Sequence, residues 1–166
     1  MSWLALVRHG DLNGPVGLQM DPEGNLYIGN FNDGKILKRT PAGAISVIGD
    51  VPGWLGFIAL AGDAIYATGY QAHRIYRAPV DGSGMTIFAG TGIAGQQDGD
   101  VAMARFNGPN GIVASPDGST LFVSDYNTRS IRVITGLNAA SGVDEIPGNP
   151  QDRLSAFPNP FNPRVT

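Results

Sequence analysis

The sequence predicts an all-β protein, a β-propeller of three four-stranded blades, and three observations lead to this prediction. The segment Asn13–Ile36 returns as Asn107–Ile131 almost without gaps, and Pro22 corresponds to Pro116, 94 residues later. A weaker copy lies between them, 39 residues after the first, so the repeat is about 40 residues long. The 166 residues include 24 glycines and 12 prolines, as expected where tight turns join many short strands. Such a repeat indicates a β-propeller or a similar array.

Each repeat is expected to form the strands of one blade. Apolar and polar residues alternate over short runs, which is typical of half-buried strands. Asp21–Gly24 (DPEG) and Ser115–Gly118 (SPDG) predict the turn after the first strand, because proline presets φ and glycine tolerates positive φ. The predicted strands are Val16–Met20, Leu26–Asn30, Ile36–Arg39 and Ala44–Ile48, then Phe57–Ala61, Ala64–Thr68, Arg74–Ala78 and Met85–Ala89, then Ile112–Ser115, Leu121–Ser124 and Ser130–Ile134.

The third repeat has no evident fourth strand, whereas Trp3–Arg8 (WLALVR) has a strand pattern but no blade of its own. We therefore expect three blades over residues 1–135, shifted by one strand, followed by a linker over residues 136–153. Open edge strands template aggregation. Two copies related by a two-fold axis would close a six-bladed ring, with Trp3–Arg8 of each copy completing the third blade of the other. The alternative is that the chain is a fragment of a longer protein.

Composition argues against several classes of function. Only 15% of residues are charged and the net charge is −3, with no basic stripe, so nucleic acid and membranes are not expected partners. Cysteine is absent, which excludes a disulfide framework and a thiolate site. No 18-residue apolar run predicts a membrane span. The patterns of serine hydrolases, zincins and P-loop NTPases are also missing.

The repeats carry a family resemblance. GPVGLQMDPEGNLYIGNFNDGKI at 14–36 and GPNGIVASPDGSTLFVSDYNTRSI at 108–131 resemble NHL repeats, and AGTGIAGQQDGDVAMARFNGP at 89–109 resembles the glycine-rich connection between NHL blades. The repeat is also similar to a wider six-bladed group that contains gluconolactonase relatives, paraoxonase-like lactonases, diisopropyl-fluorophosphatase and streptogramin B lyase. The resemblance implies a fold more than a function, because propellers host many activities.

The end of the chain resembles something different. LSAFPNPFNPRV, Leu154–Val165, looks like the start of the sorting domain of type IX secretion substrates, whose hallmark is a PNPFNP core. The resemblance implies that the parent protein is exported, secreted or held at the cell surface. Residues 154–166 are expected to form a truncated, extended tail, because their prolines block a helix or a long ladder.

Polar residues gather in the loops that enter each first strand and that join strands two and three, so a site is expected on this face. His9 and His73 are the only histidines and are candidate acid/base groups, with Asp11 as a carboxylate partner of His9. An ordinary exposed loop position is the alternative for His73. The residues that we assign to ligand binding are Trp54, Arg105, Asn107 and Asp125.

Asn110, in the sequence PNG, is the candidate metal ligand. In lactonase-like and phosphatase-like propellers the residue between Pro and Gly at this place supplies an oxygen to a central calcium, and the resemblance carries that role to Asn110. The implied cofactor is calcium or another divalent cation. The counterparts Val16 and Leu55 cannot coordinate, and calcium takes six to eight oxygens. The alternative is that the Asn110 amide bonds to backbone in a turn.

Phe31, Tyr70 and Tyr126 align with one another, and this recurrence predicts repeated packing rather than a stack for a ligand. Three functions stay open. The first is an exported propeller that binds a ligand or surface partner. The second is a divalent-metal-dependent hydrolase of lactones, esters or phosphotriesters, with its site in the channel of the homodimer. The third is a lyase of the streptogramin type that uses His9 or His73.

Overall fold

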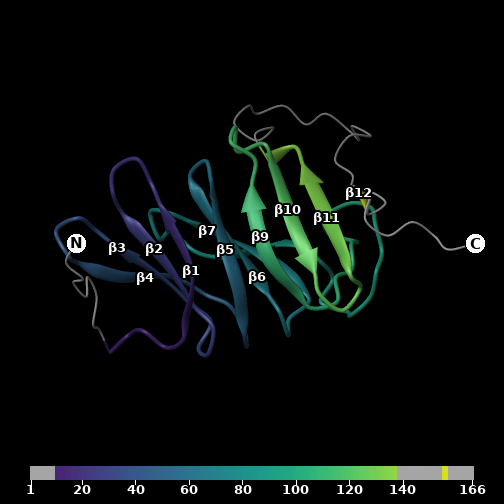
Figure 1. The fold of residues 1–166 in the computed structure, drawn as a ribbon, viewed down its shortest axis with the longest axis horizontal. Coiled ribbons are helices and arrows are strands. Elements are labelled where there is room, and N and C mark those ends of the chain that lie inside the picture. The colour runs from purple at the N-terminus through teal and green to yellow at the C-terminus, as the bar shows by residue number, and fades with distance from the viewer. Residues whose placement is uncertain (1–9, 138–154, 157–166) are drawn as a thin grey trace, which may run out of the picture.

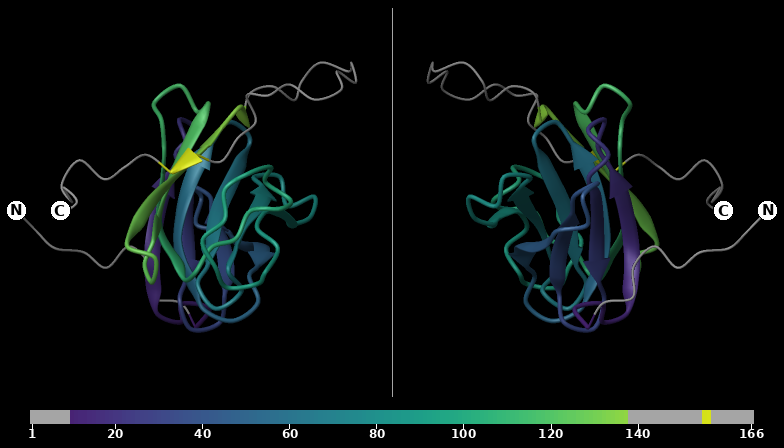
Figure 2. Two further views of the ribbon diagram at one scale, coloured as in Figure 1. Left: turned by 90° about the vertical axis from the view of Figure 1, so that its right-hand side faces the viewer. Right: turned by 90° about the vertical axis from the view of Figure 1, so that its left-hand side faces the viewer.

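The computed structural model describes residues 10–137 and 155–156, which form three antiparallel four-stranded sheets. Figure 1 shows the three sheets side by side as successive blades, and the views in Figure 2 agree. The first blade has strand order β1-β2-β3-β4, the second β5-β6-β7-β8 and the third β9-β10-β11-β12. Their bounds are Pro15–Met20, Leu26–Asn30, Lys35–Arg39 and Ile45–Asp50, then Leu55–Ala61, Ala64–Gly69, Arg74–Pro79 and Thr86–Ala89, then Pro109–Ala114, Thr120–Asp125, Ser130–Thr135 and Ser155–Ala156.

The first strand of every blade (β1, β5 and β9), called the inner strand below, begins earlier than the alternation of the sequence predicts. β9 begins at Pro109, three residues before the predicted start at Ile112. The reason is a register shift between the first and second strand of each blade, which lies between Pro15 and Gly17 in the first blade. An extra residue there breaks the period of two and turns the backbone.

The third blade gains its fourth strand from the tail of the same chain. Ser155–Ala156 pairs with β11 through Val133 and Arg132, in the place where Trp3–Arg8 of a second copy was expected. The tail thus contributes two residues of ladder before the prolines begin. Trp3–Arg8 lies outside the described residues, so strand exchange with a partner stays a prediction.

The blades pack face to face through two apolar layers. Between the first and second blade lie Tyr27, Ile36, Leu55 and Ile58, each 3% exposed or less. Between the second and third blade the core is formed by Tyr66, Ile75, Phe106, Leu121 and Val123. Gly17 is required at the first layer, because a Cβ there would lie 2.8 Å from Ile58 Cγ1. Each blade buries only the faces that meet a neighbouring blade, so the outer faces of the first and third blades remain uncovered.

One loop position explains why three unlike residues align. Gly34, His73 and Arg129 occupy the same place between the second and third strands, and all have positive φ, at 72°, 54° and 55°. His73 and Arg129 are the only non-glycine residues with positive φ in the described part of the chain. The loop demands this backbone conformation in every blade, and glycine is the residue that adopts it without cost.

As for membranes, the described residues form no helix of the length and apolar character needed to cross one.

Candidate functional site

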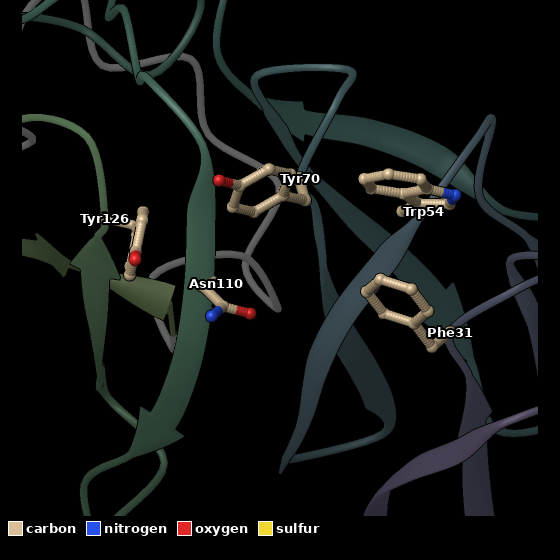
Figure 3. Close-up of a pocket in the computed structure, with 5 residues that line it drawn as sticks. All are labelled: Phe31, Trp54, Tyr70, Asn110 and Tyr126. Carbon is tan, nitrogen blue, oxygen red and sulfur yellow. The ribbon is translucent and has the colours of Figure 1, made fainter.

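A pocket of about 300 Å³ opens at the end of the blades where the second-to-third strand loops meet the inner strands. Figure 3 shows the five residues that line it, Phe31, Trp54, Tyr70, Asn110 and Tyr126. They come from all three blades. The volume lies at the small end of the range for small-molecule sites.

Each blade places one aromatic ring at the pocket by a backbone hydrogen bond to the residue just before its inner strand. Phe31, Tyr70 and Tyr126 each directly follow the second strand of their blade. The backbone N–H of Phe31 donates to Gly14 O at 2.8 Å, and that of Tyr126 to Gly108 O at 3.1 Å. In the middle blade Tyr70 N–H donates to Trp54 O at 2.9 Å. These bonds join the loop to the start of the inner strand and hold the ring at its mouth.

The rings form two pairs and stay open to solvent. Phe31 stacks on Trp54 with centroids 5.3 Å apart and planes 26° apart, and Tyr70 lies 6.2 Å from Tyr126 at 56°. Tyr126 is 64% exposed and Trp54 43% exposed. The recurring aromatic was predicted to serve packing rather than a stack for a ligand. The two ring pairs are packing contacts, and the same rings line the pocket and leave part of their surface uncovered. A cluster of exposed aromatic side chains is the kind of surface that marks a binding site.

Asn110 stands on β9 beside the pocket and is half-buried. Its backbone oxygen accepts a hydrogen bond from Thr68 Oγ1 at 2.5 Å, which ties β9 to the middle blade. Gly56 permits this approach, because a Cβ there would lie 2.9 Å from Asn110 Oδ1. Among the described residues its side-chain amide makes no hydrogen bond, which removes the predicted alternative of an amide bonded to backbone. The amide is available to a ligand.

The donors around Asn110 fall short of a calcium site. Calcium takes six to eight oxygens, and the pocket lining supplies one amide and no carboxylate. The part of the chain that the structure describes contains no group of three or more histidine, cysteine or acidic residues arranged for a metal. A divalent cation at Asn110 would need ligands from a second copy, and it stays a prediction.

Asp125, predicted to bind a ligand, lies in the interior. It is 1% exposed; its Oδ1 accepts the backbone N–H of Asn107 at 2.7 Å, and its Oδ2 lies 3.6 Å from Arg132 Nη1. Asn30 occupies the same place in the first blade, where its Nδ2 donates to Asp11 O at 2.7 Å. Both side chains fasten the loop that enters the inner strand. A surface ligand cannot reach Asp125, so its role is structural.

Burial raises the pKa of Asp125 above its ordinary value of 3.8, and the hydrogen bond from Asn107 and the charge of Arg132 offset this only in part. A raised carboxyl pKa means that the fold favours the protonated form. The stability that protonated Asp125 contributes is therefore fully present below pH 3.8, and it is lost as the pH rises through the raised pKa.

We expect Asp125→Ala to lower the free energy of unfolding by about 2 kcal/mol, because the loop bond to Asn107 is lost beside a buried guanidinium. Asp125→Asn should cost about 1 kcal/mol or less, since Asn30 shows that an amide fits this position. Urea unfolding measures both free energies. As the pH falls toward 3.8, the free energy of unfolding of the wild type should rise relative to that of Asp125→Asn. Equal losses for both variants would contradict the assignment.

The candidate acid/base residues do not gather at the pocket. His73 Nδ1 accepts the backbone N–H of Gly108 at 3.1 Å and so bridges the second and third blades. This is a structural contact through Nδ1, and the other ring nitrogen, Nε2, takes no part in it. Asp11 contributes its backbone carbonyl to Asn30 and is exposed. His9 lies outside the described residues, so the predicted pair with Asp11 has no geometry here.

The other predicted ligand residues divide in the same way. Trp54 lines the pocket, and its role as a ligand contact stays a prediction. Asn107 Oδ1 accepts from Asn127 Nδ2 at 3.1 Å, which closes the loop of the third blade. Arg105 packs its side chain over Gly95, where a Cβ would lie 3.3 Å from Arg105 Cδ, and does not line the pocket. The sequence signal for the missed residues was the aromatic that recurs after each second strand.

Comparisons with known proteins agree on the fold. No family model matches the chain, and no curated protein matches it. Among solved structures, an auxiliary nutrient binding protein from Bacteroides ovatus is 21% identical and matches 88% of this chain and 36% of its own, with a TM-score of 0.65. Virginiamycin B lyase from Staphylococcus aureus, bound to quinupristin, is 22% identical over 94% of this chain and 44% of that one, with a TM-score of 0.60.

The crystal structure of a nidogen/laminin complex is similar as well, at 24% identity, with 77% of this chain and 46% of that chain covered and a TM-score of 0.61. The chain spans less than half the length of each of these proteins. Together with the three four-stranded sheets, the similarities place this chain among the β-propellers.

Proposed function

We propose that this chain is a ligand-binding propeller segment of NHL type, with its site at the aromatic pocket. One observation carries the proposal: four aromatic rings and an unpaired amide meet at one pocket, with no acid, histidine, lysine or arginine among the lining residues. Such a lining offers apolar faces and neutral hydrogen bonds, which suit binding. General acid/base catalysis instead needs a group that titrates near the working pH.

The two enzymatic alternatives gain no specific support from the pocket. A metal-dependent hydrolase needs a cation to polarise its substrate, and Asn110 is the one side chain in the lining that carries an amide oxygen. A rise in melting temperature with added calcium would support the hypothesis of a metal-dependent hydrolase. A lyase that uses His73 Nδ1 as its base would have to break the hydrogen bond from Gly108 N–H. Export of the parent protein belongs to the proposal and is supported by the sorting-type motif at residues 154–166.

Removal of the rings tests the site directly. With indole and p-cresol as probes, we expect saturation-transfer NMR to show binding to the intact chain. Trp54→Ala and Tyr126→Ala should each weaken it about tenfold, because truncating an aromatic anchor costs over 1 kcal/mol. Ile87→Ala, at an exposed residue on β8, is the control and should bind like wild type. Binding that survives in both pocket variants would place the ligand elsewhere.

We also propose that two copies close a six-bladed ring. Leu18 and Met20 on β1 are 62% and 61% exposed and face away from the second blade, because they alternate with the buried Gly17. At the other end Val113 and Phe122 are cross-strand partners, 58% and 40% exposed. Apolar faces at both ends of three blades fit the end faces of a second copy.

Light scattering on a sizing column should give a mass near twice 17.4 kDa. Leu18→Asp should shift the protein to the monomer, because it buries a charge against an apolar face. Ile87→Asp, on the outer strand of the middle blade, should leave the mass unchanged. A wild-type monomer would refute ring closure by two copies.

A further inference from the structure

The charge of the lining restricts what the pocket accepts. None of its five residues is an aspartate, glutamate, histidine, lysine or arginine. The polar groups of the lining are the Asn110 amide, which both donates and accepts, and the hydroxyls of Tyr70 and Tyr126. A charged ligand would lose its water without gaining an opposite charge. The geometry therefore favours a neutral ligand that carries several hydroxyl or amide groups.

The spacing of the rings restricts the ligand further. Phe31 and Trp54 are 5.3 Å apart and already in contact, so no third ring fits between them. Tyr70 and Tyr126 are tilted by 56° and form no parallel slot either. A flat heterocycle therefore cannot be sandwiched between the two rings of either pair. The rings offer one-sided platforms, on which a ligand lies from the solvent side.

An aromatic cage for a quaternary ammonium group is a poorer match. Such a cage surrounds the cation with ring faces. Here Phe31 and Trp54 cover each other, which removes ring faces from the pocket, and no carboxylate lines it. A purely aliphatic ligand would leave the half-buried Asn110 amide without a partner, which costs free energy.

We propose that the pocket recognises a neutral saccharide, with a pyranose ring lying on Trp54 or Tyr126 and its hydroxyls bonded to Asn110. This rests on the proposed function of the pocket as a ligand site. The C–H groups on one face of a pyranose carry partial positive charge and meet the negative face of an aromatic ring. Its hydroxyls project from the edge of the ring and need groups that donate and accept at once, as an amide does.

Figure 3 shows the arrangement that this requires. The Asn110 amide lies between Tyr126 on one side and the Phe31–Trp54 pair on the other. Two platforms therefore flank one hydrogen-bonding group, and the volume of about 300 Å³ leaves room beside it for a sugar ring. The two platforms suit adjacent units of an oligosaccharide.

The test uses the full chain and three probes: methyl β-D-glucopyranoside, methyl β-D-galactopyranoside and cellotetraose. We expect saturation-transfer NMR to label the C–H protons of at least one, with cellotetraose binding tighter than the monosaccharide if both platforms are used. Trp54→Ala and Asn110→Ala should each weaken binding about tenfold. Tyr126→Phe should keep most of the affinity that Tyr126→Ala loses, because the ring face is retained, and Ile87→Ala should match wild type.

The outcomes separate the two proposals. Binding of indole that depends on Trp54, with no binding of any saccharide, would overturn the saccharide inference and leave the ligand site standing. Failure of indole, p-cresol and all saccharides would refute both. Saccharide binding that is equal in wild type, Trp54→Ala and Asn110→Ala would overturn the inference by placing the sugar outside the pocket.

Discussion

Arg132→Ala is expected to lower the free energy of unfolding by about 3–5 kcal/mol, because it removes one partner of a buried charge network. The Arg132 side chain is fully buried and donates to Arg105 O and Gln97 O, both at 2.8 Å, and to Asp98 Oδ1 at 2.7 Å. Its guanidinium also lies 3.6 Å from the buried Asp125 carboxylate. The substitution frees the connection between the second and third blades and removes the ion-pair partner of Asp125.

The matched control is Arg77→Ala. Arg77 donates to Asp63 at 2.6 Å, but the Asp63 side chain is 80% exposed. A surface pair of this kind contributes about 1 kcal/mol or less. Urea unfolding, followed by fluorescence, should therefore separate the two variants clearly. Similar losses in both would mean that Arg132 does not organise the connection.

Gly34→Ala is expected to have the second large effect, about 3 kcal/mol or more, from positive φ and a backbone clash together. Gly34 has φ 72°, and a Cβ there would overlap the carbonyl oxygen of Val51. That oxygen belongs to the backbone and cannot rotate away. The aligned His73 and Arg129 carry a Cβ at positive φ, so the conformation alone does not demand glycine.

Gly24→Ala separates the two causes. Gly24 has φ 82°, but a Cβ there would lie 3.4 Å from Pro41 Cγ, which is ordinary contact. Only the cost of positive φ remains, about 1–2 kcal/mol. Thermal and urea unfolding of the two variants should thus differ. Equal losses would show that the loop moves away from Val51.

Local patterns predicted the strands well, because the two-residue alternation and the turn residues of each repeat can be recognised within a few residues of sequence. Leu26–Asn30 appears with the predicted bounds. The early start of β9 escaped prediction because a bulge against β10 causes it, and a bulge is a property of a strand pair. The site was predicted less well. Asp125 was placed among ligand residues because it lies where the second strand meets the loop to the third, on the face expected to hold the site, whereas packing encloses it.

By itself the sequence determined the repeat, the three blades and the aromatic that recurs after each second strand. These follow from spacing along one chain, which alternation and turn residues encode directly. Only the tertiary structure decided that Phe31 meets Trp54 and that Tyr70 meets Tyr126 around Asn110. It also decided that Arg132 reaches Gln97, 35 residues away. Contacts of this kind depend on how one blade packs against the next. That packing is set by the side-chain volumes on the two blade faces that meet.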